Sequence, residues 1–306
     1  MTTPPGFEHL DCPLEFGDTS RATPRFSLIV ATIDRAHEFS ILLKSLAAQA
    51  MRDFELIVVD QNPNNRLSRM LEDWILEVNT RDTIPIRAKY LRSSPGVSRA
   101  RNLGIQHSCG EILAFPDDDS WYLPDTLRSV DAWFRRNQEY GILSLGCRDE
   151  QGRVSTNTWW QKECDIKWIN MFRTTATCCY FVRRPPTSTP PQFDPSLGPG
   201  AGTIYGCGED TDFVITLMEQ GIRARFCSRL YVGHPKRAGF VDVHRARRYG
   251  GGFGRVLAKH SCRALFVGFV AYDFTRAIAH RILGNRNRSS QLWAHGRGII
   301  SAYFSE

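Results

Sequence analysis

Three consecutive aspartates follow an apolar run in the segment "EILAFPDDDS", residues 111–120. Hard divalent cations bind carboxylate oxygens, and Mg²⁺ takes one or two carboxylates together with substrate phosphates. Residues two apart at a strand end point to the same side, so Asp117 and Asp119 can share a cation while Asp118 turns away. The alternative is a solvated acidic turn in which Asp125 caps the next helix. Their position directly after an apolar strand favours the metal site.

A second group of carboxylates lies in "GEDTDF", residues 208–213. Glu209 and Asp210 follow a glycine-rich loop, and glycine lets the backbone approach a bound ligand closely. A carboxylate held beside a bound acceptor can act as a general base. Asp212 is an alternative to Asp210 for this role. The competing explanation is that these acids only stabilise the N-terminus of the helix that they begin.

Two arginines and a histidine have the chemistry to contact phosphate groups. Arg99 and Arg101 lie near a helix start in "GVSRARNLGI", and the arginine fork suits a diphosphate. Either arginine taken alone is equally well explained as part of a solvated face. His234, in "YVGHP", can ligate a metal or contact a phosphate, although a lone histidine is more often structural.

Alternating strands and helices must position these residues. We predict strands over residues 26–31, 53–60, 86–91 and 111–115, and helices over 37–50, 66–78, 96–108 and 123–137. This order predicts a parallel, doubly wound sheet that is covered on both faces. Ligands of such sheets bind at the carboxyl ends of the strands, so Asp60 and the three aspartates should face one crevice. The less regular second half suggests strands over 141–147, 176–184 and 222–235, and a helix over 208–221.

The composition narrows the class of protein. The chain has 306 residues, 42% hydrophobic and 23% charged, which is enough for a real core and excludes general disorder. Its net charge of +7 suits an anionic partner. Because there is no zinc finger, RNA-recognition signature or basic-aromatic array, we expect no nucleic-acid partner. The nine cysteines form no CxxC pair and suggest reduced thiols packed as small apolar side chains in a cytosolic protein. We expect neither a secretory signal nor a membrane-spanning segment.

Five motifs, in this order, resemble those of family-2 glycosyltransferases of the A-type fold. They are "SLIVATIDR", "FELIVVDQN", "GVSRARNLGI", "ILAFPDDDSWYLPDTL" and "FDPSLGPGAGTIYGCGEDTDF". Each motif is weak alone, but their order and spacing are fairly specific. The resemblance implies a Rossmann-like, doubly wound mixed sheet with a helical C-terminal extension. We expect a lead-in over residues 1–24, a catalytic domain over 25–240 and the extension over 241–306.

The resemblance also implies an inverting single displacement that uses a nucleotide-sugar donor and Mg²⁺ or Mn²⁺. Asp119 would ligate the metal directly, and Asp117 would contact the ribose or the metal's water. His234 would contact the metal or the diphosphate. Asp210 would be the base, and Glu209 would position the acceptor.

Further residues are expected at the donor. Asp60 would contact the nucleobase, and Arg101 would lie near the donor. We expect the nucleotide sugar also to be contacted by Thr32, Arg99 and Asp118. Because "DQNPNN" stands where the family usually has "DDGSTD", the choice among UDP, GDP and dTDP stays open. The chain has no QxxRW motif, which argues against a processive polysaccharide synthase.

The C-terminal region points to the acceptor. The stretch "RYGGGFGRVLAKH" is similar to one in relatives that build bacterial surface polysaccharides, which implies a glycan or a lipid-linked oligosaccharide acceptor. Residues 262–306 are apolar with basic edges. They suit a helix in the membrane interface or, equally, one that covers the protein's own core. The expected location is the cytoplasm, with peripheral contact at the inner face of the membrane as one alternative.

Two other functions compete with sugar transfer. A nucleotidyltransferase also combines an α/β fold with carboxylate-bound Mg²⁺, but it normally has a glycine-rich loop after the first strand. Here "ATIDRAHEF" contains no glycine. A non-catalytic module that binds nucleotide or glycan would not need the three acids Asp117, Asp119 and Asp210.

Overall fold

The chain forms two compact units. The structure, a computed structural model, describes residues 13–17, 23–81, 85–155, 159–186, 190–236 and 242–305. The first unit comprises Met1–Pro95, Arg99–Gln192 and Leu217–Arg237. The second unit comprises Gly96–Ser98, Phe193–Thr216 and Ala238–Glu306. Each unit carries part of the predicted chemistry.

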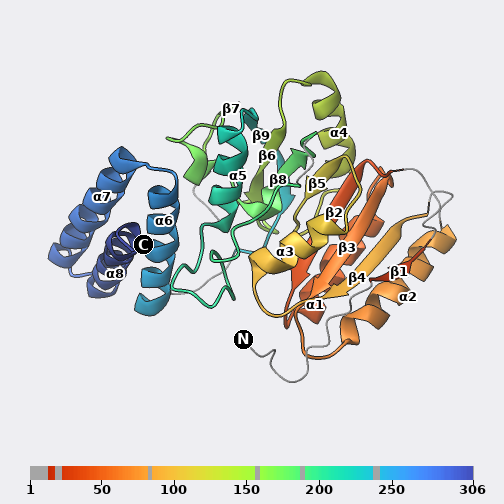
Figure 1. Cartoon of the computed structure of the whole chain (residues 1–306), viewed down its shortest axis with the longest axis horizontal. Coiled ribbons are helices and arrows are strands. Elements are labelled where there is room, and N and C mark those ends of the chain that lie inside the picture. The colour runs from red at the N-terminus through yellow and green to blue at the C-terminus, as the bar shows by residue number, and fades with distance from the viewer. Residues whose placement is uncertain are drawn as a thin grey trace. The chain divides into compact units, whose positions relative to one another are not determined.

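The described residues of the first unit form a nine-stranded sheet in the order β1-β4-β3-β2-β5-β8-β6-β9-β7 (Figure 1). The strands are β1 (Leu14–Phe16), β2 (Phe26–Thr32), β3 (Phe54–Asp60), β4 (Arg87–Arg92), β5 (Ile112–Ala114), β6 (Ile142–Arg148), β7 (Cys164–Asp165), β8 (Tyr180–Arg183) and β9 (Ala224–Gly233). Strands β4, β3, β2 and β5 run parallel, as predicted. Strand β8 is antiparallel to both β5 and β6, so the sheet is mixed, which confirms the fold class.

The helices follow the predicted alternation. They are α1 (Ala36–Ala47), α2 (Arg66–Arg81), α3 (Val97–Gln106), α4 (Thr126–Arg136), α5 (Glu209–Glu219), α6 (Val243–Lys259), α7 (Arg263–Ile282) and α8 (Arg286–Tyr303). Two short 3-10 turns, η1 (Met171–Arg173) and η2 (Thr177–Cys179), lie between β7 and β8. Only the last part of the strand predicted over 176–184 is therefore extended. Part of the predicted lead-in, β1, pairs antiparallel with β4.

The central strands are buried along their whole length. Every residue of β3 is buried, and β2 has one half-buried position, Ala31. Continuous apolar strands are typical of a parallel sheet that helices cover on both faces. In α1 the buried side chains are spaced three or four residues apart, at Phe39, Leu42, Leu43 and Leu46. This periodicity turns one face of the helix toward the core.

The sheet brings strand ends together at its carboxyl edge. Thr32 and Asp60 are register partners at the ends of β2 and β3, and both are fully buried. Backbone hydrogen bonds extend this edge, since the N–H of Ser93 donates to the carbonyl oxygen of Asp60. Strand β5, which lies on the other side of β2, leads into Asp117–Asp119. The acids are thus placed by parallel pairing.

In the second unit, α6, α7 and α8 pack together (Figure 1). The glycines of α6 allow close backbone contacts. A Cβ on Gly250 would lie 2.0 Å from the carbonyl oxygen of His295, in α8. A Cβ on Gly252 would lie 2.0 Å from the carbonyl oxygen of Cys207, in the loop before α5. Helix packing therefore accounts for these glycines without an acceptor contact.

Candidate active site

Asp117, Asp119 and His234 converge in the first unit. The Nε2 atom of His234 lies 3.1 Å from an Asp119 oxygen and 3.8 Å from an Asp117 oxygen. The two acids follow β5, and the histidine follows β9. The sheet therefore brings together residues that are far apart in the sequence, as the metal hypothesis requires.

A two-residue bridge holds the loop that carries Asp117–Asp119, here called the acid loop, against the end of β9. The backbone N–H of Trp121 donates to the carbonyl oxygen of Gly233 over 2.9 Å, and the reverse bond is 2.8 Å. The contact requires a glycine, because a Cβ on Gly233 would lie 1.9 Å from the Trp121 ring. This bridge sets the position of the next residue, His234.

The donor set fits a divalent cation. One ligand atom from each of Asp117, Asp119 and His234 lies within 4.8 Å of the others. Carboxylate oxygens suit Mg²⁺ and Mn²⁺, and an imidazole nitrogen is acceptable to Mn²⁺. The Nδ1 atom of His234 lies 2.9 Å from the carbonyl oxygen of Pro235. This partner orients the ring, so that Nε2 faces the acids.

The acids also hold His234 in its charged form when no cation neutralises them. Burial lowers the pKa of His234, but the hydrogen bond to Asp119 and the charges of Asp117 and Asp119 outweigh it. Together with the Pro235 carbonyl they raise the pKa of His234 to about 9. Metal binding would have to displace this proton.

Asp118 has a basic partner, Arg35, which it shares with Asp119. Its carboxylate pairs with Arg35 at 2.7 Å, and Arg35 also reaches Asp119 at 2.8 Å. Burial raises the pKa of Asp118 to about 6, although the Arg35 charge opposes this shift. We did not predict Arg35 from the sequence. The available signal was its position in "ATIDR", just after the end of β2.

The two arginines of α3 differ in their surroundings. Arg101 is buried and lies 3.2 Å from an Asp117 oxygen. It therefore belongs to the acid cluster, the group formed by Asp117, Asp118 and Asp119 with their partners. Arg99 instead donates to the carbonyl oxygen of Pro95. The contact that we predicted between Arg99 and the nucleotide sugar stays a prediction.

Asp60 is fully buried and holds the loop after β3. One carboxylate oxygen accepts from the backbone N–H and the side-chain amide of Asn62, at 2.8 and 2.6 Å. The other oxygen accepts from the Tyr90 hydroxyl at 2.7 Å. Asn62 in turn accepts from the backbone N–H of Asp34 at 2.8 Å, which ties together the loops after β2 and β3. Asp60 therefore has a structural role that sequence reasoning did not assign. The contacts that we predicted between the nucleotide sugar and Asp60 and Thr32 stay predictions.

The candidate base belongs to the second unit. Asp210 is half-buried at the start of α5, where one of its oxygens accepts from the backbone N–H of Thr211 at 2.7 Å. Glu209 is buried, and a Cβ on Gly198 would lie 2.9 Å from its carboxyl carbon. The glycine at 198, with φ of +94°, makes room for this carboxylate.

Asp212, the alternative base, is engaged by two basic side chains. It is buried and lies 2.9 Å from Nζ of Lys259 and 2.8 Å from Nε2 of His260. Lys259 also pairs with Asp194 at 2.9 Å. Both carboxylate oxygens of Asp212 therefore already have basic partners. Of the two acids, Asp210 is the better candidate base.

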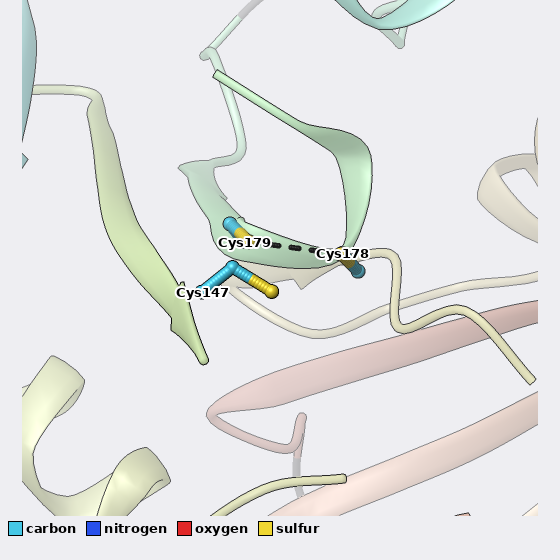
Figure 2. A group of neighbouring side chains, drawn as sticks. All are labelled: Cys147, Cys178 and Cys179. Atoms are coloured by element: carbon cyan, nitrogen blue, oxygen red, sulfur yellow. Dashed lines mark hydrogen bonds between the residues drawn. The ribbon is translucent and has the colours of Figure 1, made fainter. Parts of the chain in front are cut away.

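Three buried cysteines cluster in the first unit. Figure 2 shows Cys147, from β6, beside Cys178 and Cys179, whose sulfur atoms lie 3.6 Å apart. Burial and hydrogen bonding within the cluster raise the pKa of Cys178 and Cys179 well above the usual value. Such thiols stay protonated and pack as small apolar groups. The sequence alone did not indicate that they meet.

The chain is similar to known proteins in sequence and in fold. Residues 27–184 match the model of the family described as Glycosyl transferase family 2. An uncharacterized glycosyltransferase of Haemophilus influenzae is 30% identical over 117 residues. That match covers 38% of this chain and only 37% of the relative's own length.

Two solved structures share the fold. The mannosyltransferase PcManGT of Pyrobaculum calidifontis, in complex with GDP-Man and Mn²⁺, is 14% identical with a TM-score of 0.59, over 92% of this chain and 88% of that one. TarS of S. aureus, in complex with UDP, is 16% identical with a TM-score of 0.54, over 90% of each chain. At such identities the likeness establishes the fold alone.

Proposed function

Because this chain belongs to the family 2 glycosyltransferases, we propose that it is a metal-dependent, inverting enzyme. It transfers a hexosyl or deoxyhexosyl group from a nucleotide sugar to a hydroxyl group of a glycan or lipid-linked acceptor. The convergence of Asp117, Asp119 and His234 at the carboxyl edge of the sheet carries this proposal. Solved structures of the same fold with bound UDP or GDP-Man support a nucleotide-linked donor, but they leave the nucleobase of that donor open.

The residues of this chain supply binding and proton transfer. Bound Mg²⁺ or Mn²⁺, held by Asp117, Asp119 and His234, would neutralise the diphosphate leaving group. Arg101, at Asp117, and Arg35, at Asp118 and Asp119, add positive charge where the diphosphate develops negative charge.

Asp210 acts as the general base. It takes the proton of the acceptor hydroxyl while that oxygen attacks the anomeric carbon and the bond from this carbon to the diphosphate oxygen breaks. Attack from the face opposite the leaving group inverts the anomeric centre. Glu209, buried beside Gly198, positions the acceptor. In this proposal residues 25–240 form the catalytic domain, and residues 241–306 form a helical C-terminal extension that contacts the acceptor or the membrane. The enzyme works in the cytoplasm or at the inner face of the cytoplasmic membrane.

Metal-supported nucleotide binding tests the proposal. Titration calorimetry of UDP, GDP and dTDP with and without Mn²⁺ should show that one nucleotide binds at least tenfold more tightly with the metal. The double change Asp117→Asn/Asp119→Asn should abolish that gain. Asp125→Asn is the matched control, because Asp125 is an exposed acid of the same unit that pairs only with Arg128 among the ion pairs described. If the double variant keeps the full metal effect, the proposed site is wrong.

The proposed base needs a separate measurement. Asp210→Asn should leave Mn²⁺-supported nucleotide binding within twofold of the wild type, because the base does not hold the donor. It should lower sugar transfer at least a thousandfold with whichever donor the wild type accepts. Near-normal transfer by this variant would contradict the assignment.

A further inference from the structure

Helix α7 exposes an uncharged stripe along its whole length. The uncharged exposed positions recur every three or four residues, so they form one helical face: Ala264, Val267, Gly268, Ala271, Tyr272, Thr275, Ile278, Ala279 and Ile282. With 20 residues the helix is about 30 Å long. A surface helix of a water-soluble protein normally turns its charged side outward. Here the outward side carries charge only at its two ends, at Arg263 and Arg281.

The opposite side of α7 is held by α8. Asp273 pairs with His295, and the Ser289 hydroxyl donates to the carbonyl oxygen of Ala277 at 2.8 Å. The rings of Phe274 and Trp293 pack with centroids 4.6 Å apart. These contacts fix the rotation of α7. Its uncharged stripe therefore faces away from α8.

The three C-terminal helices carry a strongly positive charge. In α6, α7 and α8 the acidic residue is Asp273, which is buried against His295. The same helices carry Lys259 and the arginines at 245, 247, 248, 255, 263, 276, 281, 286, 288 and 297. Arg263 and Arg281 are exposed at the two ends of α7. An uncharged face with arginines at its margins matches the composition of helices that lie in a membrane interface.

We propose that α7 binds an anionic lipid surface, with its stripe in the interface and its arginines at the headgroups. Charge decides between this occupant and a second copy of the chain. Two copies joined through α7 would bring two strongly basic surfaces together, whereas anionic lipid neutralises them. Three arginines near such a surface, such as Arg263, Arg276 and Arg281, strengthen binding on the order of a hundredfold. No described helix is both long and apolar enough to cross a membrane, so the contact is peripheral.

Vesicle sedimentation of the full chain tests this partner. Binding to vesicles of phosphatidylcholine mixed with phosphatidylglycerol should be at least tenfold stronger than to phosphatidylcholine alone. It should weaken as salt is added, because salt screens the arginines. The proposal adds a partner to the proposed transferase and does not depend on it. Failure of vesicle binding would leave metal-supported nucleotide binding unaffected.

Matched substitutions test whether lipid binding depends on the apolar side chains of the stripe or on any exposed apolar side chain of the protein. Val267→Gln/Ile278→Gln changes side chains that are 63% and 51% exposed, so the fold should persist, as circular dichroism can verify. We expect at least a tenfold loss of binding to the anionic vesicles, because apolar area no longer enters the interface. Leu76→Gln, on α2 in the first unit, removes a 61% exposed side chain and should change nothing.

Three results would overturn the proposal. One is equal binding by wild type and the double variant, and another is no preference for anionic vesicles. The third is a dimer in sedimentation velocity without lipid that Val267→Gln/Ile278→Gln dissociates, because a second copy would then cover the stripe.

Discussion

Replacing Gly233 with alanine should uncouple His234 from the acid loop. The added Cβ would lie 1.9 Å from Cε2 and 2.0 Å from Nε1 of Trp121, so the ring must move. Overpacking of this kind costs about 1–3 kcal/mol. If the ring takes its backbone with it, the two bridge hydrogen bonds of 2.9 and 2.8 Å are lost at about 1 kcal/mol each. The free energy of unfolding should therefore fall by about 3–5 kcal/mol, a large part of the usual 5–15 kcal/mol.

Urea unfolding followed by circular dichroism measures this loss as a lower midpoint at an unchanged slope. Titration of Mn²⁺ in the presence of nucleotide should also show at least tenfold weaker binding, because His234 directly follows the altered residue. The matched control is Gly146→Ala in the neighbouring strand β6. There the nearest atom to a new Cβ is 3.5 Å away, so stability should change by no more than about 0.5 kcal/mol. If Gly233→Ala unfolds at the same midpoint as Gly146→Ala, our account of the bridge is wrong.

Two further predictions concern buried carboxylates. Glu55 accepts a hydrogen bond from the Ser27 hydroxyl at 2.6 Å. Burial alone would raise the pKa of Glu55. Hydrogen bonds from the Cys109 backbone and from Ser27, together with the charge of Lys89, instead lower this pKa below the usual 4.5. Glu55 therefore contributes its full stabilisation above the pKa that it has in the unfolded chain. This stabilisation disappears as the pH falls through the lower pKa that Glu55 has in the folded protein. Glu55→Gln should lower the free energy of unfolding by about 2–4 kcal/mol at neutral pH. In urea titrations at several pH values, the variant's free energy of unfolding should fall less steeply toward acid pH than that of the wild type (the acid limb). Asp212→Asn should cost about 3–5 kcal/mol in the same assay, because the two basic groups on Asp212 lose their buried partner.

Asp125→Asn serves as the control for both carboxylates, because its partner Arg128 is exposed and such surface pairs contribute about 1 kcal/mol at most. An acid limb for Glu55→Gln as steep as that of the wild type would contradict the first prediction. A midpoint for Asp212→Asn equal to that of Asp125→Asn would contradict the second.

The sequence was sufficient for the elements of the first unit, because each depends on a local pattern. The apolar runs that became β2 and β3 are buried strands, and the periodic positions of α1 face the core. The prediction over 176–184 was less accurate, because Thr177–Cys179 forms a 3-10 turn. The strand begins only at Tyr180.

Contacts between distant segments could not be predicted in this way. Arg35 becomes part of the acid cluster only because β2 and β5 are neighbours in the sheet. Asp212 is enclosed only because the end of α6 lies against the start of α5. A residue pattern records spacing along the chain, and it does not record which remote side chain arrives.

The sequence by itself determined that carboxylates end a buried strand in an alternating α/β chain, because apolar periodicity and parallel pairing suffice for that conclusion. Only the tertiary structure decided that His234 completes the group with Asp117 and Asp119, since β9 reaches the acid loop through the Trp121–Gly233 bridge. The tertiary structure likewise decided that the uncharged face of α7 points outward, because that depends on how α8 holds the helix and no local pattern records it.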